Sequence, residues 1–160
     1  MKIQSILSMT IWISLLLVIP ACTQEKGEQA KNVELTNAAW TAFSTGDFQG
    51  AITAADKCVQ RFKGQADKDQ ADLQSKHVPL PPTGKVSAAE KQAIFRNGVL
   101  NDVATCYWIK GKSAQGLHRD DEARQAYKAA ASYTYARTWD PKGWFWSPTE
   151  DASDRLQDLK

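Results

Sequence analysis

Apolar side chains recur every three or four residues along most of the chain, which is the spacing of one face of an α-helix. The clearest stretch runs from Leu35 to Phe62, where two such runs are separated by Gly46-Asp47. Glycine commonly ends a helix and aspartate caps the start of the next. We therefore expect two antiparallel helices joined by a tight turn, with Gly64 ending the second. Valine and isoleucine form no alternating runs, so the predicted fold class is all-α.

Start signals predict further helices, seven in all over the chain. A polar helix is expected from Asp67 to His77, before a proline-rich loop over 78–84. Serine followed three residues later by glutamate is the capping-box pattern of a helix start, and it occurs at Ser87 and at Ser147. Asn101 is expected to cap the helix between these two.

Small residues occur at fixed positions in the first hairpin, at Ala39, Ala51 and Cys58, together with a Gly-Asp-aromatic turn at 46–48. These positions resemble the tetratricopeptide repeat, a helical hairpin of about 34 residues. A second match is carried by Tyr107, Gly111, Ala114, Ala123, Tyr127 and Ala130. It departs from the family pattern at Lys110, where leucine is usual, and at His118, which replaces the turn glycine.

The resemblance implies a short array of TPR-like antiparallel helical hairpins over 32–160, closed by a C-terminal capping helix. Repeat-like segments are expected at 32–65 and 104–137, with a degenerate segment at 66–103 between them. Residues 138–160 would form the cap.

The first 21 residues have the pattern of an export signal, with a basic Lys2, an apolar run and small residues before a cleavage point. The run is too short for a confident membrane span, which needs roughly 20 apolar residues. It ends in Ile19-Pro20-Ala21-Cys22, which resembles the bacterial lipobox. The resemblance implies a lipoprotein acylated with palmitate or a similar chain on Cys22. An ordinary cleaved signal with an incidental cysteine is the alternative.

A lipid on Cys22 would hold the protein at a cell membrane on the periplasmic side. Thr23 stands where inner-membrane retention uses aspartate, so the outer membrane is favoured in a Gram-negative cell. The following polar segment, 22–31, is expected to be a flexible tether.

Composition argues against several classes of function. A formal net charge of +2 over 160 residues is no footprint for nucleic acid. His77 and His118 lie on different elements, and no ligand spacing such as His-x-x-x-His or Cys-x-x-Cys occurs, so no metal site is predicted. Gly111-Lys112-Ser113 lacks the earlier glycine of a phosphate-binding loop. The chain is therefore expected to have no cofactor and no catalytic residue, and not to be an enzyme.

Besides the lipidated Cys22, the mature chain would contain two cysteines, Cys58 and Cys106. In an oxidising compartment they could form a disulfide. Because free cysteine is also a common buried apolar residue, two separate buried thiols are the other alternative.

The tetratricopeptide resemblance also implies a concave groove lined by the first helix of each hairpin. The implied partner-binding residues are Trp40, Phe43, Trp108, Lys112 and Gln115, with Val33, Thr36 and Thr105 beside them. The aromatic side chains would supply apolar contact, and Lys112 and Gln115 would orient the partner. Alternatively, Trp40 and Trp108 pack inside the domain.

The tail contains four aromatic residues around a predicted turn at Pro141 and Gly143: Trp139, Trp144, Phe145 and Trp146. They could cap the last hairpin or form a platform for a ligand. As a cap, the alternation of an extended segment would bury Trp144 and Trp146 and turn Phe145 outward.

The sequence thus predicts a membrane-anchored, non-catalytic scaffold that binds a protein or peptide in the cell envelope. The alternative is a glycan-binding or peptidoglycan-binding module that uses the C-terminal aromatic cluster.

Overall fold

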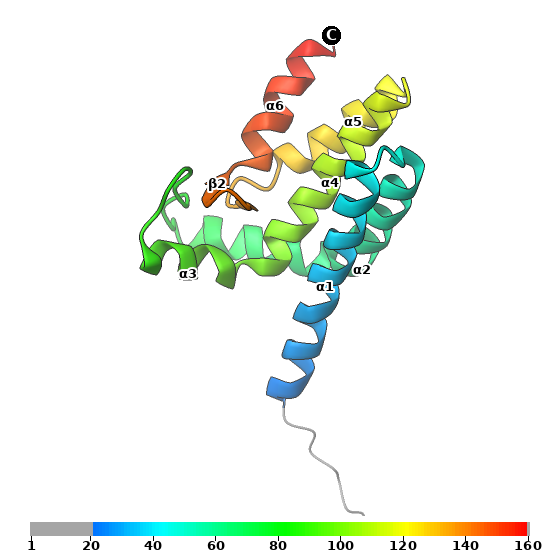
Figure 1. The fold of residues 1–160 in the computed structure, drawn as a ribbon. Coiled ribbons are helices and arrows are strands. Elements are labelled where there is room, and N and C mark those ends of the chain that lie inside the picture. The colour runs from blue at the N-terminus through cyan, green and yellow to red at the C-terminus, as the bar shows by residue number, and fades with distance from the viewer. Residues whose placement is uncertain (1–20, 160) are drawn as a thin grey trace, which may run out of the picture.

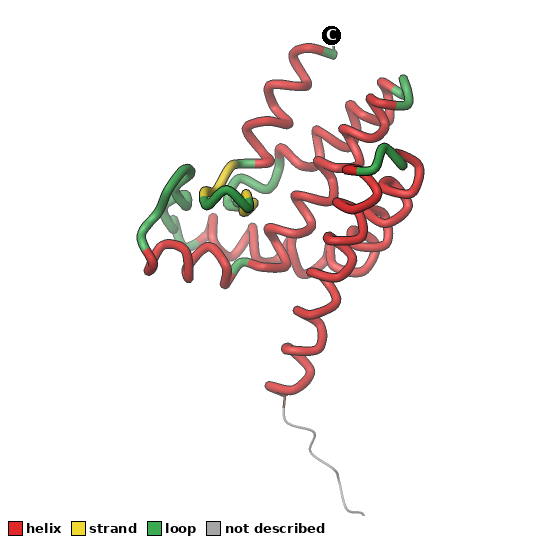
Figure 2. Tube along the Cα trace, in the orientation of Figure 1, coloured by secondary structure: helices red, strands yellow, loops and turns green. Residues whose placement is uncertain are grey.

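The protein is mostly helical, with one short hairpin of strands (Figures 1 and 2). The computed structural model describes residues 21–159, with side chains from residue 31 onward. The six helices of this part are α1 (Ala21–Ser44), α2 (Phe48–Ser75), α3 (Ala88–Arg96), α4 (Gly98–Gly116), α5 (Asp120–Ala131) and α6 (Pro148–Asp158). The strands are β1 (Thr138–Asp140) and β2 (Trp144–Trp146), which pair antiparallel. The predicted helical class is confirmed, and the strand hairpin was not predicted.

Helix α4 lies at the centre of the domain and contacts α1, α2, α5 and α6. Two helical hairpins, α1–α2 and α4–α5, pack directly on each other through α2 and α4. Figure 1 shows α3, its neighbouring loop and the β-hairpin on one side of the domain, with α6 rising above the hairpin. The segment 66–103, expected to be a degenerate repeat, comprises the end of α2, helix α3 and the start of α4.

The turns of the two helical hairpins have the same hydrogen bonds at positions 72 residues apart. The amide of Asp47 donates to the carbonyl of Ala42 at 2.9 Å, and the amide of Arg119 donates to Ala114 at 2.9 Å. Gly46 has a φ of 80°, and its counterpart His118 has a φ of 57°. His118 thus takes the left-handed conformation that glycine adopts more easily.

Helix α2 does not end at Gly64, so that prediction is wrong. The helix continues through Gly64 to Ser75, so that two of the seven expected helices form one continuous helix. The half of α2 after Gly64 is stabilised by tertiary contacts, which helix propensity does not take into account. Gln70 Nε2 donates to Thr134 Oγ1 at 2.8 Å, and the Tyr133 hydroxyl donates to Asp67 Oδ1 at 2.6 Å.

The predicted caps are confirmed at three helix starts. Asp47 Oδ1 accepts from the amide of Gly50 at 2.9 Å. Ser87 and Glu90 form the reciprocal capping box of α3. Ser147 Oγ accepts from the amide of Glu150 at 3.2 Å at the start of α6. These short-range patterns were legible because both partners lie within one turn.

Asn101 is not a helix cap, since α4 already begins at Gly98. Its buried side chain joins three segments of the chain instead. Asn101 Nδ2 donates to the carbonyl of Ile94 at 2.8 Å, and its Oδ1 accepts from the amide of Arg137 at 2.9 Å. The side chain thereby satisfies backbone groups that would otherwise be buried without partners.

Helix α1 begins at Ala21, within the segment 22–31 that was expected to be a tether, and the tether stays a prediction. The export signal and the Cys22 side chain lie outside the part of the chain whose side chains are described. Within the described residues, no helix is both long enough and apolar enough to span a membrane.

Candidate functional site

Two adjoining clefts form a groove between α1, α4 and the β-hairpin. The first cleft has a volume of about 680 Å³, and its lining includes Asn32, Val33, Trp40, Asp102, Arg137 and Trp139. The second cleft, of about 590 Å³, is lined in part by Trp108, Trp144, Glu150, Asp151 and Asp154. Both clefts also share Trp40, Asp140 and Trp146. The groove therefore brings together residues from the two ends of the folded chain.

The β-hairpin that forms one wall is closed by a tight turn. The amide of Gly143 donates to the carbonyl of Asp140 at 2.9 Å, and Gly143 has a φ of 100°. The amide of Lys142 donates to Asp140 Oδ1 at 2.8 Å. A three-residue connection with glycine in the left-handed region is a common hairpin solution. The predicted turn at Pro141 and Gly143 is confirmed, and it brings Trp139 next to Phe145 across the strands.

The burial of Trp144 and Phe145 is the reverse of the prediction, whereas Trp146 is half-buried against the hydrophobic core. Phe145 is fully buried, whereas Trp144 is 37% exposed. Phe145 packs on the ring of Phe95 at a centroid distance of 5.4 Å and on that of Trp139 at 4.9 Å. Its backbone also pairs with Gly84, at 2.7 and 2.9 Å. The inner face of the hairpin is therefore the one turned to α3, and Trp144 lines the second cleft.

A cluster of four aromatic rings lies where the two clefts adjoin, and two of its rings, Trp40 and Trp146, line both clefts. Trp108 lies at its centre, with ring-centroid distances of 5.5 Å to Trp40, 6.0 Å to Phe43 and 5.0 Å to Trp146. The contacts of Trp108 with Phe43 and Trp146 are edge-to-face, an arrangement that adds stability beyond the buried area. The cluster fixes Trp40 and Trp146, which are the rings common to both clefts.

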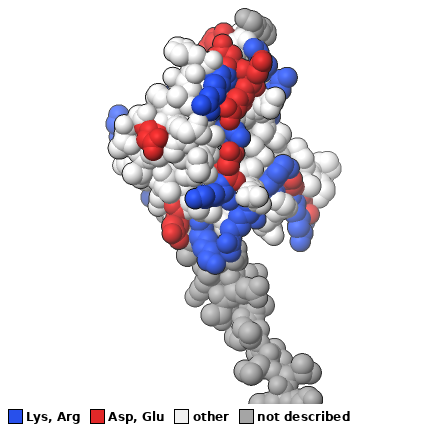
Figure 3. Space-filling model, turned by 90° about the vertical axis from the view of Figure 1, so that its right-hand side faces the viewer, with Lys and Arg blue, Asp and Glu red and all other residues white. Residues whose placement is uncertain are grey.

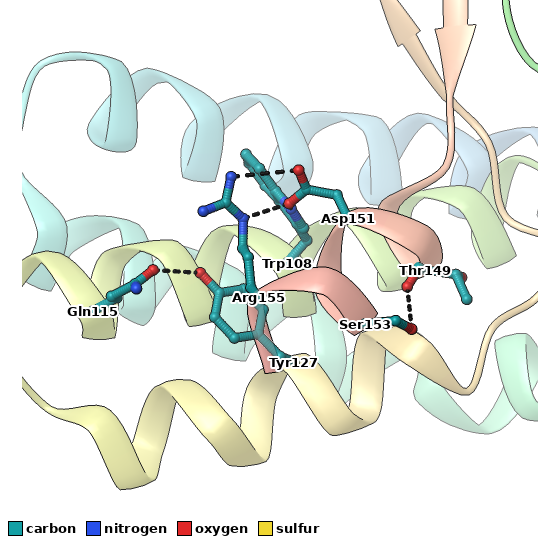
Figure 4. Close-up of polar contacts among 7 residues, drawn as sticks. All are labelled: Trp108, Gln115, Tyr127, Thr149, Asp151, Ser153 and Arg155. Carbon is teal, nitrogen blue, oxygen red and sulfur yellow. Dashed lines mark hydrogen bonds and ion pairs between the residues drawn. The ribbon is translucent and has the colours of Figure 1, made fainter. Parts of the chain in front are cut away.

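The side of α6 that faces Trp108 holds a charged network (Figure 4). The indole Nε1 of Trp108 and the guanidinium of Arg155 both donate to the carboxylate of Asp151. The second Arg155 bond, from its terminal nitrogen Nη2 to Asp151 Oδ1, measures 3.3 Å. Asp151 thus fixes α6 against α4 and places a negative charge at the wall of the second cleft.

The structure divides the expected partner-binding residues into two groups. Trp40 lines both clefts, and Trp108 lines the second although it is only 8% exposed. Phe43, Lys112 and Gln115 do not line either cleft. Gln115 Oε1 accepts from the Tyr127 hydroxyl at 3.0 Å inside the α4–α5 hairpin (Figure 4). Burial and the charge of Arg155 lower the pKa of Lys112.

The two cysteines are free thiols and fully buried, so the structure shows no disulfide between Cys58 and Cys106. They nevertheless share one neighbour. The Thr36 hydroxyl lies 3.7 Å from Cys58 Sγ and 3.4 Å from Cys106 Sγ. Burial, together with the neighbouring Cys58, raises the pKa of Cys106 well above its usual value, which makes its thiol a poor nucleophile.

A carboxylate and an amide that sequence analysis missed meet in the first cleft. Asn32 Nδ2 donates to Asp102 Oδ2 at 2.6 Å, although the two residues are 70 positions apart. Burial raises the pKa of Asp102 to about 6, and the bond from Asn32 opposes that shift. Asn32 is fully buried, and its Oδ1 has no hydrogen-bond partner. No short motif could have revealed a pair this far apart in the chain.

The raised pKa of Asp102 predicts a pH-dependent gain from Asp102→Asn. The folded state holds the Asp102 proton up to about pH 6, whereas the unfolded state releases it near 3.8. The stability that Asp102 contributes is thus complete below its unfolded pKa and is lost as pH rises through about 6. A shift of this size corresponds to at most about 3 kcal/mol, reduced because the carboxyl is not wholly buried. Urea melts of both proteins should show the stability of Asp102→Asn, relative to wild type, rising between pH 4 and 7; a constant difference would contradict this.

The second cleft is rich in acidic side chains: Asp140, Glu150, Asp151 and Asp154. The face in Figure 3 instead shows lysine and arginine interspersed with aspartate and glutamate. Among the described residues, no group of three or more histidine, cysteine, aspartate or glutamate side chains is arranged to hold a metal ion. The clefts therefore combine tryptophan rings with carboxylates.

Comparison with known proteins gives this chain no relative. No protein-family model matches it, and neither a curated protein nor a solved structure does.

Proposed function

We propose that this protein is a membrane-anchored, non-catalytic scaffold that binds a peptide or protein segment of the bacterial cell envelope in the groove between α1 and the β-hairpin. The observation that carries the proposal is the row of tryptophans along two adjoining clefts: Trp40, Trp139, Trp144 and Trp146. Tryptophan is enriched at sites where few residues supply most of the binding energy.

The equivalence of the two helical hairpins supports a TPR-like array. Ala51 and Ala123, 72 residues apart, are both fully buried, as are Cys58 and its counterpart Ala130. The two turns share their hydrogen bonds, as described above. Arrays of such hairpins present an extended concave surface to their partners. In this reading α1 and α4 are equivalent first helices, and both line the groove.

The size and shape of the groove favour an extended segment over a compact small molecule. The two clefts, of about 680 and 590 Å³, adjoin at Trp40, Asp140 and Trp146 rather than forming one closed chamber. An extended peptide places successive side chains in separate sites along such a surface. The apolar walls would receive its apolar side chains, and the carboxylates would orient its polar ones.

Anchoring through a lipid on Cys22 belongs to the same proposal and rests on the Ile19-Pro20-Ala21-Cys22 sequence. In bacteria given labelled palmitate, the wild-type protein should take up label and Cys22→Ser should not. Equal labelling, or none in either protein, would contradict the anchor without bearing on the groove.

Substitutions at the exposed rim of the groove test the binding proposal. Val33 is 46% exposed and lines the first cleft, and Trp144 lines the second. Val33→Arg and Trp144→Ala should each reduce recovery of a specific crosslinked envelope protein about tenfold or more, because losing an interface anchor commonly costs 2 kcal/mol or more, about thirtyfold in affinity. Crosslinked envelopes, affinity capture and quantitative mass spectrometry give the measurement.

The matched control is Leu80→Arg, since Leu80 is 58% exposed but lines neither cleft. It should recover the same protein in the same amount as wild type. Equal recovery with all three variants would contradict the groove as the binding site.

A glycan is the second candidate ligand, because the exposed Trp144 lies beside Asp140, Asp151 and Asp154 in the second cleft. Exposed aromatic rings next to hydrogen-bonding carboxylates also suit sugar rings. This candidate is favoured if purified cell-wall sacculi retain the wild-type protein and release Trp144→Ala. Retention of neither protein would exclude it.

A further inference from the structure

The base of the first cleft contains an acceptor without a donor. The Asn32 amide has a fixed orientation, because its Nδ2 must be the atom that faces the Asp102 carboxylate at 2.6 Å. Its Oδ1, the other atom of the same amide, is buried and has no hydrogen-bond partner. A buried acceptor left without a donor costs about 1–3 kcal/mol, so native proteins rarely keep one without a reason.

The same place carries a negative charge that no neighbouring cation balances. Among the described side chains, no lysine or arginine forms an ion pair with Asp102. Arg137 lines the cleft, but its guanidinium donates to the carbonyls of Pro81, Thr134 and Ala136 at 2.8, 3.1 and 2.6 Å. The Arg137 guanidinium is thus bound to the proline-rich loop and to the segment before β1. The Asp102 carboxylate and the Asn32 amide oxygen therefore have no positively charged donor beside them in the described part of the chain.

We infer that the first cleft binds a primary ammonium group on an alkyl stem, held by Asp102 and Asn32 Oδ1, with the stem along the ring of Trp40. An ammonium has three donors on one atom, enough for both acceptors at once. Trp40 lines the same cleft, and an indole face attracts a nearby cation as well as the apolar stem. The inference rests on the proposed function and narrows it, since it names the group of the partner that enters the cleft.

Other cations fit this arrangement less well. Guanidinium binds best to a carboxylate with both oxygens free, and one Asp102 oxygen already accepts from Asn32. A calcium ion takes six to eight oxygen ligands, whereas only two side chains, Asp102 and Asn32, would supply oxygen atoms here. A compact ammonium needs only the acceptors that are present.

Small probes measure the ammonium preference without knowledge of the natural partner. Nα-acetyl-lysine methylamide carries the side-chain ammonium, and the same compound acetylated on Nζ is its neutral counterpart. A trialanine amide with a free N-terminus carries an ammonium on the peptide end. Titration followed by the indole NMR signals of the wild-type protein should show the first probe binding about tenfold or more tightly than its neutral counterpart, since charged hydrogen bonds are about twice as strong.

The third probe separates the two sources of an ammonium. Binding of the lysine compound alone assigns a lysine side chain of the partner, and binding of trialanine amide alone assigns a peptide N-terminus. Equal affinity for the charged and the acetylated lysine compounds, with no binding of trialanine amide, would overturn the inference. This comparison uses only the wild-type protein and so does not depend on how a variant folds.

Asp102→Asn then locates the site, with Asp72→Asn as the control for loss of one negative charge. Asp72 is exposed on α2 and lines neither cleft. The first substitution should weaken binding of the preferred ammonium probe about tenfold or more, and the second should leave it unchanged. Equal effects of the two substitutions would overturn the assignment to Asp102. Because the probes need no partner, failure of the ammonium site and failure of the groove as a partner-binding site give different results in the two experiments.

Discussion

Replacing Phe145 by alanine should lower the free energy of unfolding by about 3–5 kcal/mol, the usual cost of truncating a buried aromatic side chain. Phe145 is fully buried between Phe95 and Trp139, and it holds the hairpin against α3. Because small domains have a total stability of about 5–15 kcal/mol, the loss would be a large fraction of the whole. Urea unfolding followed by tryptophan fluorescence would measure it.

The adjacent residue provides the control for Phe145. Trp144 is 37% exposed and lines the second cleft, so Trp144→Ala should cost less than about 1 kcal/mol. The larger side chain would then be the less important one for stability. A large loss of stability in Trp144→Ala together with a small loss in Phe145→Ala would mean that the opposite face of the hairpin turns inward.

Two glycine-to-alanine substitutions should change stability in opposite directions. At Gly111 a Cβ atom would meet the ring of Tyr127 at 2.5 Å, within a packed crossing of α4 and α5. Overpacking of this kind costs about 1–3 kcal/mol. At Gly64 a Cβ would meet nothing within 4 Å, so alanine should stabilise helix α2 by about 1 kcal/mol.

Thermal melts of the two glycine variants give the comparison, because each variant adds the same methyl group inside a helix. Gly111→Ala should melt below wild type and Gly64→Ala above it. A stabilised Gly111→Ala would mean that α4 and α5 do not approach each other closely there. A destabilised Gly64→Ala would mean that α2 is broken at that position.

Short-range features of the fold were predictable from the sequence. The Gly46-Asp47 turn and the Ser87 capping box depend on partners within one helical turn, and the structure confirms both. The prediction that the helix ends at Gly64 was wrong because the local cost of glycine in a helix, about 1 kcal/mol, is smaller than the contribution of the tertiary contacts beyond it. Those contacts come from Tyr133 and Thr134, which the local pattern cannot place beside α2.

The aromatic tail shows a different limit of sequence analysis. Alternation along 144–146 was legible, but the pattern does not say which face turns inward. That choice depends on Phe95, which reaches the hairpin only after the 76–87 connection has positioned α3. The site pair Asn32 and Asp102 was missed for the same reason, since its members are 70 residues apart. Trp40 could be named from the sequence because the tetratricopeptide resemblance assigns a position on one helix, which needs no knowledge of distant contacts.

The second half of α2 stays helical because it is bonded to a segment that lies far away in the sequence. Its bonds from Asp67 and Gln70 go to residues 133–135, which follow α5. A short length of mostly solvated helix that begins near a glycine has little tendency to remain helical alone. The two segments therefore form one cooperative unit of local unfolding: when residues 133–135 detach, residues 64–75 lose protection against amide hydrogen exchange with them. The first half of α2, packed against α4, stays folded through such an opening, so one continuous helix belongs to two units of different stability.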